Sequence, residues 1–435
     1  MSDIKLKKSF QYLKIAEKRI PSLTQTFSKA AFTFVKGAYP VYVDHAKGSH
    51  IFDVDNNEYI DYLCGLGPIL LGYQYKPVDE AIKRQLKNGI LFSLPHKIEL
   101  DLAEMICKTV PSAEMVKYSK TGSDAVTFAI RAARAITKRD KIAYCGTMGV
   151  QHDWQTVLTT RDYGIPKWNK KQIYTFEYNK IETLEKIFEN DGKNIAAVCM
   201  EPTLFELPEK DFLNKAKKLT HEHGAVLIFD EIVTGFRFSI GGGQEKFKVK
   251  PDITCLGKGM ANGMPLGAVV GKKEYMKIFD DVFFSSTNQG ETLSLAAGLV
   301  TINEIRTKNV PKKIWSIGGK LQNGYNKISS EHDVDIKFTG YPVRMKIVCK
   351  DPSGKESPEI KSLMLQEMVK RGIFLHPNVS YISFSHNNAD VNKTLDAFDE
   401  SVKLIKKSIK DNTVKQKLKG EIIRPVFPPK DLHKI

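Results

Sequence analysis

The chain has 435 residues, of which 42% are hydrophobic and 27% charged, and its net charge is +16 at pH 7. A chain of this length is too long for a single ordinary hydrophobic core, so we expect two or more packed units. Its apolar runs are shorter than the roughly 20 residues of a membrane helix, so we expect no membrane partner. The lysines are spread along the whole chain, without the basic and aromatic stripe that tracks a phosphate backbone, which argues against nucleic acid.

Residues 1–20 carry lysines at helical spacing, without the apolar stretch and small-residue cleavage site of a secretion signal, so a cytoplasmic location is expected. The six cysteines are far apart and form no C-x-x-C pair, which argues against both a disulfide framework and a zinc ribbon. His221 and His223 come nearest to a metal cluster, but two positions apart on a helix they do not share a face. We therefore interpret them as a solvated helix end and expect no metal.

The first elements predicted along the chain are short strands. Residues 39–43, 51–54 and 59–63 have a β-like pattern, with a turn at 55–57. Between residues 78 and 110 the periodicity predicts two amphipathic helices. The apolar stripe of the second helix is predicted to contain Leu100, Leu102, Ala103, Ile106 and Val110.

Strands and helices then alternate. Short apolar runs at 141–145, 195–200, 225–229 and 253–256 predict buried parallel strands, and the helix predicted at 211–223 ends at Gly224. Such alternation is typical of an α/β sheet covered on both faces. After Gly319 the composition indicates a smaller carboxy-terminal domain with a helix at 391–409 and a basic tail beyond Asn412.

Two carboxylates, Asp230 and Glu231, directly follow the apolar run 225–229. Ligands of open α/β sheets lie beyond the carboxyl ends of the strands. A buried acid at that position costs several kcal/mol unless a positive charge meets it, so the pattern predicts a cationic partner. A helix-capping or salt-bridged acid is the alternative interpretation.

Lys258 follows the next predicted strand, 253–256. Burial lowers the pKa of an amine and makes it nucleophilic enough to form a Schiff base with an aldehyde cofactor. A phosphate P-loop is excluded because Asp252 and Gly259 stand where glycine and a hydroxyl residue are required, and a dinucleotide fingerprint fails at Asn262.

Gly122 and Ser123 precede a helix with a clear apolar stripe. The start of such a helix binds anions, although plain capping by Ser123 explains the same residues. Together, an anion site, a strand-end acid and a strand-end lysine provide the three attachments that pyridoxal 5'-phosphate needs, for its phosphate, its ring nitrogen and its carbonyl.

With these motifs, residues 20–407 resemble the class III aminotransferases, in the branch that includes glutamate-1-semialdehyde aminomutase. The similarity lies in Asp230 to Arg237, Leu256-Gly257-Lys258, the turn at Gly122 and Ser123, and Thr287 within residues 286–291. It implies that Lys258 carries the cofactor, Asp230 pairs with its ring nitrogen, Ile232 packs on its ring, and Gly122 and Ser123 bind its phosphate.

The resemblance also implies a homodimer with shared sites, in which Thr287 reaches the phosphate bound by the partner subunit. The fold implied is fold type I of the pyridoxal-phosphate enzymes: a large α/β domain with a mostly parallel seven-stranded sheet, and a small α+β domain built from both chain ends. We place the large domain at residues 76–315 and the small domain at 1–75 and 316–435.

Departures from the family pattern concern the substrate. The family's Tyr-His-Gly segment, which stacks on the cofactor ring, reads Gly146-Thr147-Met148-Gly149 here, so Met148 is our candidate for the stacking residue, with His152 as the alternative. Glu201 is a pocket residue or a structural acid, and Arg237 binds a carboxylate or forms a structural salt bridge.

The segments Gly65-Leu66-Gly67-Pro68 and Ser28-Lys29 resemble relatives that aminate sugars or keto-sugar acids. The predicted function is therefore transfer of an amino group from a donor such as glutamate to a sugar or keto-sugar-acid carbonyl, in two stages on Lys258. The alternatives are an aminomutase acting on glutamate-1-semialdehyde and, from another class, a non-catalytic basic interaction protein on the same scaffold.

Overall fold

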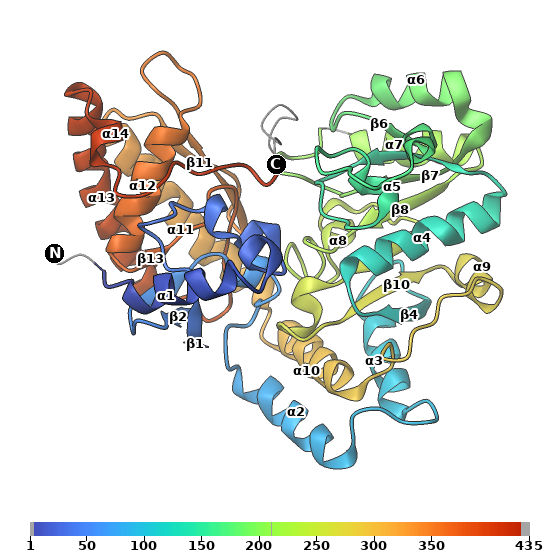
Figure 1. Ribbon diagram of the computed structural model, residues 1–435. Coiled ribbons are helices and arrows are strands. Elements are labelled where there is room, and N and C mark those ends of the chain that lie inside the picture. The colour runs from blue at the N-terminus through green and yellow to red at the C-terminus, as the bar shows by residue number, and fades with distance from the viewer. Residues whose placement is uncertain (1–3, 210, 428–435) are drawn as a thin grey trace. The chain divides into compact units, whose positions relative to one another are not determined.

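The computed structural model describes residues 4–209 and 211–427 (Figure 1). The chain forms two compact units, one from residues 67–69 and 76–312, the other from residues 1–66, 70–75 and 313–435. The blue and the orange-red ends of the chain in Figure 1 thus belong to the same unit. Among the described residues, no helix is both long enough and apolar enough to span a membrane.

The larger unit is built on a seven-stranded sheet, with the strand order β4-β10-β9-β8-β7-β5-β6. Its neighbouring strands are parallel, except that β10 runs antiparallel to both β4 and β9. The predicted runs 141–145, 195–200 and 253–256 match strands of the structure, and the run 225–229 matches with a shift of one residue. The strands are β4 (Met115–Ser119), β5 (Lys141–Cys145), β6 (Ile173–Thr175), β7 (Ile195–Met200), β8 (Val226–Asp230), β9 (Ile253–Leu256) and β10 (Gly267–Gly271).

Helices cover both faces of this sheet, which explains why its central strands β7, β8 and β9 are apolar except at Asp230 and Thr254. Along β8, Val226 and Ile228 pack into one hydrophobic cluster with the buried face of α4 (Gly122–Thr137). The alternate residues Leu227 and Phe229 pack into a second cluster with α6 (Ile181–Asp191) and α7 (Phe212–Glu222). The predicted α/β architecture is confirmed.

Other helices of this unit were also predicted. The two predicted between residues 78 and 110 are α2 (Lys76–Asn88) and α3 (Lys97–Cys107). The predicted stripe of α3 is wrong at Leu100, which is 61% exposed, because the buried face repeats through Leu102 and Ile106. The remaining helices are α5 (Asp153–Thr156), α8 (Gly243–Phe247), α9 (Lys273–Met276) and α10 (Thr292–Thr307).

The smaller unit joins the two chain ends in one sheet, because β3 (Glu58–Asp61) pairs in parallel with β13 (Ile373–Phe374). The strand predicted at 39–43 is wrong: β1 spans Val43–Lys47, and Tyr39 is instead a buried side chain that donates to the Leu375 carbonyl and stacks on Phe34. The other elements are α1 (Lys7–Ala16), β2 (His50–Asp53), β11 (Ile336–Tyr341), β12 (Arg344–Cys349), β14 (Ser380–Tyr381), α12 (Pro358–Lys370), α13 (Asn388–Lys410) and α14 (Val414–Lys417). Helix α11 (Val310–Glu331) runs through Gly319 without a break.

Candidate active site

Five of the seven predicted site residues line one cavity in the larger unit, with a volume of about 230 Å³. They come together because β8 and β9 are adjacent parallel strands and α4 packs across the same sheet. The predicted residues are Gly122, Ser123, Asp230, Ile232 and Lys258, and the cavity is completed by Val126, Thr147, Gly149, Val150, Glu201 and Val233.

Asp230 is the last residue of β8 and is partly buried, whereas the other residues of this strand are fully buried. Its Oδ1 accepts a hydrogen bond of 3.0 Å from the Ile232 N–H, which orients the carboxylate. Burial, followed by the negative charge of Asp230, raises the pKa of both Tyr144 and Cys199 well above their usual values. An acid in such a place interacts strongly with a positive charge brought against it.

Lys258 begins the short helical turn Lys258–Ala261 directly after β9. Its φ is +43°, in the left-handed region that non-glycine residues avoid. Strained backbone of this kind persists where the surrounding structure fixes it, and it is common at functional sites.

The turn before α4 is arranged for an anion, but its cap is not the one predicted. Thr121, rather than Ser123, caps the helix: its Oγ1 accepts from the Asp124 N–H at 3.1 Å, and Asp124 accepts from the Thr121 N–H at 2.9 Å. Within the described part of the chain, the N–H groups of Gly122 and Ser123 have no acceptor, as the first N–H groups of a helix do not. They lie at the cavity, where a phosphate could bind.

Ile232 explains two glycines of the site. A Cβ atom on Gly122 would lie 2.9–3.1 Å from three side-chain carbons of Ile232, and one on Gly257 would lie 3.0 Å from its Cδ1. The Ile232 side chain is therefore enclosed between the turn that precedes α4 and the residue that precedes Lys258. This positions a branched apolar side chain on the cavity wall, as the packing against a flat ring requires.

Among the described residues, Glu231 does not have the cationic partner that the sequence predicted. It is fully buried, and it accepts hydrogen bonds from neutral donors: the N–H groups of Gly243 and Gln244, the Thr234 hydroxyl and the Gln244 amide. Burial raises the pKa of Glu231, although these bonds act in the opposite direction. Gly242, with φ of +86°, turns the chain so that the start of α8 meets this carboxylate.

Glu201 follows β7 and holds part of the cavity wall in place. It is 2% exposed, and its Oε1 accepts both from the Thr147 N–H at 2.7 Å and from the Thr147 hydroxyl at 2.6 Å. Thr147 was not among the predicted site residues. The signal for it was the segment 146–149 itself, whose alternate residues Thr147 and Gly149 line the cavity.

Met148 and His152 lie apart from the residues that line the cavity. Met148 packs against the hydrophobic cluster beneath α4. The Nδ1 atom of His152 lies 2.6 Å from the Thr127 hydroxyl, and its Nε2 lies 3.6 Å from Asp124. A stacking role for Met148 therefore stays a prediction that requires a side-chain rearrangement.

Thr287 is exposed and is likewise not among the cavity residues. Arg237 is buried and donates to the Gly67 carbonyl. His221 lies in the exposed last turn of α7, as predicted, and in addition its Nε2 lies 2.9 Å from the fully buried Asp252, which also accepts from Lys272 at 3.0 Å. The described residues contain no cluster that could bind a metal.

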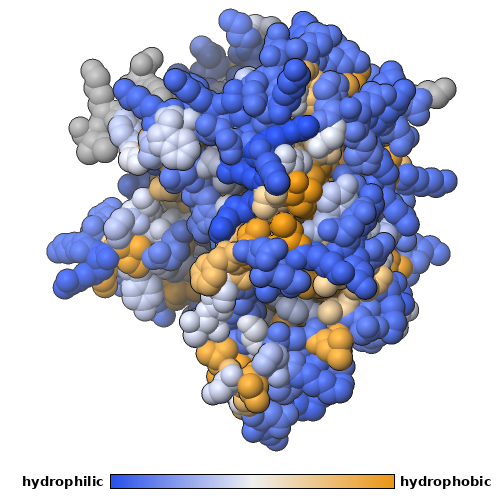
Figure 2. Space-filling model, turned by 90° about the vertical axis from the view of Figure 1, so that its right-hand side faces the viewer, coloured by the Kyte–Doolittle hydropathy of each residue, from blue (hydrophilic) through white to orange (hydrophobic). Residues whose placement is uncertain are grey.

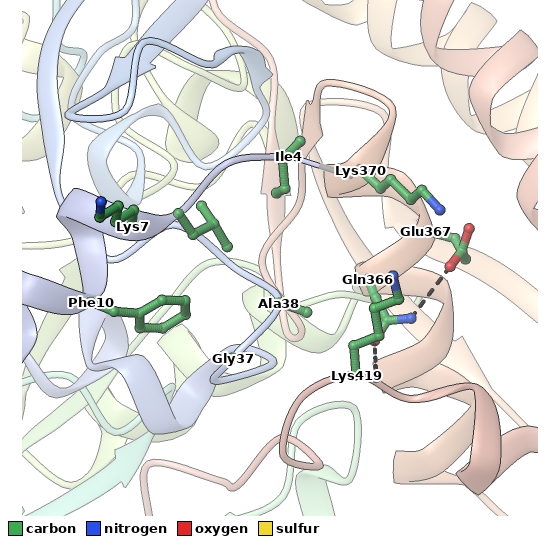
Figure 3. Close-up of a pocket in the computed structure, with 10 residues that line it drawn as sticks. Ile4, Lys7, Phe10, Gly37, Ala38, Gln366, Glu367, Lys370 and Lys419 are labelled. Carbon is green, nitrogen blue, oxygen red and sulfur yellow. Dashed lines mark hydrogen bonds between the residues drawn. The ribbon is translucent and has the colours of Figure 1, made fainter. Parts of the chain in front are cut away.

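A cavity of about 320 Å³ lies entirely within the smaller unit (Figure 3). Lys7, Lys370 and Lys419 line it together with Phe10. Its one carboxylate, Glu367, accepts from Gln366 and from Arg371. It lacks the combination of strand-end acid, strand-end lysine and helix start found in the larger unit.

The residues of the cavity in the larger unit fit pyridoxal phosphate. The two N–H groups at the start of α4 match its phosphate, Asp230 its ring nitrogen, Ile232 its ring face and Lys258 its aldehyde. These groups come from the start of α4, from the end of β8 and the residues directly after it, and from the turn after β9, so the fit depends on the fold as well as on residue type.

Comparison with known proteins agrees with this fit. The family described as "Aminotransferase class-III" matches residues 34–381. The chain is 34% identical to the 3-aminobutyryl-CoA aminotransferase of Cloacimonas acidaminovorans, over 93% of this chain and 99% of that protein. It is 36% identical to the glutamate-1-semialdehyde 2,1-aminomutase of Archaeoglobus fulgidus, over 84% of this chain and 93% of that protein.

Among solved structures, the FumI protein of Sphingopyxis sp. MTA144, in its PLP internal aldimine form, superimposes with a TM-score of 0.87 at 28% identity, covering 93% of this chain and 98% of that one. An omega-transaminase from Sphaerobacter thermophilus superimposes with a TM-score of 0.84 at 25% identity, covering 91% and 97%. The fold is fold type I, the cofactor is pyridoxal 5'-phosphate, and the chain belongs to the class III aminotransferases.

Proposed function

We propose that this transaminase moves an amino group from a donor such as glutamate to the carbonyl of a sugar or keto-sugar acid. The observation that supports this acceptor is the chemistry of the cavity wall. Its described lining includes the hydroxyls of Ser123 and Thr147 and the carboxylates of Glu201 and Asp230, while Lys258 is its only cation. Hydroxyls and carboxylates suit a polyhydroxylated acceptor, because they can donate hydrogen bonds to its hydroxyl groups and accept hydrogen bonds from them.

Each site residue has a distinct task. When bound, pyridoxal phosphate supplies an aldehyde that carries the amino group and a ring that accepts electrons. Lys258 Nζ forms the covalent attachment and, once displaced by the donor amine, moves a proton between substrate carbon and cofactor. The Asp230 carboxylate holds a proton on the ring nitrogen through a charge-assisted hydrogen bond in a poorly hydrated site. Ile232 keeps the ring in place, and the start of α4 binds the phosphate.

We further propose that the protein is a homodimer in which Thr287 completes the partner subunit's phosphate site. The larger unit exposes large apolar side chains along residues 86–100, and Phe283, close to Thr287 in sequence, is 77% exposed. On the face shown in Figure 2 hydrophilic residues predominate and hydrophobic ones form small groups, so a run of exposed apolar residues is unusual for this surface. The exposed residues are Leu86, Ile90, Leu91, Phe92, Leu94 and Leu100.

The acceptor is tested with the purified holoenzyme. Glutamate is added to convert it to its aminated form, the donor is removed, and carbonyl compounds are screened for return of the visible cofactor absorbance and for an aminated product by mass spectrometry. Oxidised sugars and keto-sugar acids should respond. A response to glutamate-1-semialdehyde alone would identify an aminomutase, and a response to 3-oxobutyryl-CoA alone would indicate the activity for which the Cloacimonas relative is named; either result contradicts the sugar proposal.

The dimer is tested by sedimentation equilibrium of the wild type and of a Leu91→Glu, Phe92→Lys variant. Two subunits are expected for the wild type and one for the variant, because charges cannot be buried unpaired at an interface core. A monomeric wild type would contradict the proposal. The predicted cytoplasmic location stays a prediction.

A further inference from the structure

An ion pair connects the turn that precedes α4 with the start of α10. Lys120 Nζ lies 2.8 Å from Glu291 Oε1, and the two side chains are only 18% and 14% exposed. The residues are 171 positions apart, so the pair joins two separate elements of the larger unit. Lys120 lies two positions before Gly122, at the end of β4.

Glu291 is held rigidly at its end of the pair. It caps α10, with its carboxylate accepting from the Leu293 N–H at 2.9 Å, from the Ser294 N–H and from the Ser294 hydroxyl. Burial alone would raise the pKa of Glu291, but the hydrogen bonds from Lys120 and Ser294 outweigh it and the pKa is lowered. The carboxylate is therefore a fixed anion to which the Lys120 side chain is anchored.

Strand β10 confines residues 119–121, which form the turn before α4. Ser119 Oγ donates to the Thr121 carbonyl at 2.9 Å, and a Cβ atom on Gly267 of β10 would lie 2.5 Å from that Oγ and 2.8 Å from the carbonyl. Strand β10 thus contacts residues 119–121 closely, while the ion pair holds them from the side of α10. A second link, from the Gln289 amide to the Tyr118 carbonyl, ties the segment that carries Thr287 to the same strand end.

We propose that Lys120 and Glu291 are positioning residues for the cofactor phosphate. Their ion pair holds the turn so that the N–H groups of Gly122 and Ser123 point to the phosphate, and it fixes the start of α10 beside the Thr287 segment. This inference rests on the proposed role of Gly122 and Ser123 as the phosphate site. Lys120 acts through the turn, because its charge is already matched by Glu291 at 2.8 Å.

The test measures the dissociation constants of the apoenzyme for pyridoxal 5'-phosphate and for pyridoxal, which lacks the phosphate. Lys120→Met should weaken binding of pyridoxal phosphate by about tenfold or more, the usual effect of removing a partner that orients ligand-binding groups. Binding of pyridoxal should stay within about twofold, and Lys120→Arg should restore most of the affinity for pyridoxal phosphate. The matched control is Lys308→Met, which removes a lysine 2.6 Å from Glu304 outside the site and should change neither constant.

Glu291→Gln distinguishes a positioning role of Lys120 from direct contact between Lys120 and the phosphate. This variant retains an acceptor that caps α10, so it also serves as the test if Lys120→Met fails to fold. Positioning predicts weaker binding of pyridoxal phosphate in this variant. Tighter binding would show that the released Lys120 contacts the phosphate itself, and would overturn the inference. Unchanged affinity, or equal loss for pyridoxal and pyridoxal phosphate, would also overturn it. If the wild type bound both compounds equally, the phosphate site itself would be wrong, which is a different failure.

Discussion

The contact between Gly122 and Ile232 gives a steric test of the site. In Gly122→Ala the new Cβ atom would lie 2.9–3.1 Å from three carbons of Ile232, well inside the ordinary contact distance of about 3.5–4 Å. Gly122 has no left-handed φ, so alanine fits the backbone and the effect is purely steric. Overpacking of this kind costs about 1–3 kcal/mol. Because the displaced side chain is the one proposed to pack on the cofactor ring, we expect most of the cost in cofactor affinity.

The expected result is a rise of about tenfold or more in the dissociation constant for pyridoxal phosphate, since 1.4 kcal/mol corresponds to roughly a factor of ten. The assay is a spectrophotometric titration of apoenzyme, carried out for Gly122→Ala, Ile232→Ala and the double variant. Ile232→Ala removes all three contacted carbons, so the double variant should bind much better than the sum of the two single effects predicts. Gly319→Ala, where a Cβ meets no atom within 4 Å, is the control and should bind normally. Additive effects of the two substitutions would refute the proposed contact, and an unchanged affinity in Gly122→Ala would refute the steric reasoning.

Three further predictions concern charges. Asp230→Asn should keep the covalent link to Lys258, seen by borohydride reduction and peptide mass spectrometry, but should slow amino transfer by about a hundredfold or more, because a neutral amide does not hold the ring-nitrogen proton; unchanged turnover would contradict this role. Asp252→Asn should lower the melting temperature, by an amount equivalent to about 2 kcal/mol, since the fully buried carboxylate pairs with Lys272 and His221 at 3.0 and 2.9 Å; equal melting temperatures would show that these half-exposed partners contribute nothing. Burial lowers the pKa of His386 to about 4, so between pH 6.5 and 4 the unfolded chain binds a proton that the folded chain does not, and stability should fall by roughly 3 kcal/mol as the pH drops through this range. His386→Gln should flatten that dependence in thermal melts, and an identical slope would disprove the assignment.

The sheet could be predicted because its central strands are buried on both faces and are therefore mostly apolar. The run 253–256 is predicted at its full length, and the alternation of strands with helices implies the parallel order. The strand predicted at 39–43 is wrong because Tyr39 is buried as a core side chain that does not belong to a strand. A short apolar run indicates burial more reliably than it indicates a strand.

The position of Lys258 and Asp230 at one cavity could be predicted, because each stands at the end of one of two buried strands. The contacts of a site residue could not be predicted where the residue that it contacts is distant in sequence. Three of the four neutral donors of Glu231 come from residues 243 and 244, beyond a glycine turn, and Lys120 contacts Glu291 across 171 positions. Ser123 was given the capping role that Thr121 fulfils, because both residues suit a cap and only the backbone at Thr121 is extended there.

The left-handed backbone at Lys258 has a consequence for the protein's history. A glycine at position 258 would relieve the strain at φ of +43°, which would raise the free energy of unfolding of the apoprotein. It would also make the unfolded chain more flexible, which would lower that free energy. If the relief of backbone strain outweighs the greater flexibility of the unfolded chain, the Lys258→Gly protein will melt at a higher temperature than the apo form of the wild type. The residue proposed to carry the cofactor would then be one that selection retains against the preference of its own backbone, and a lineage that lost the chemistry would be free to replace it.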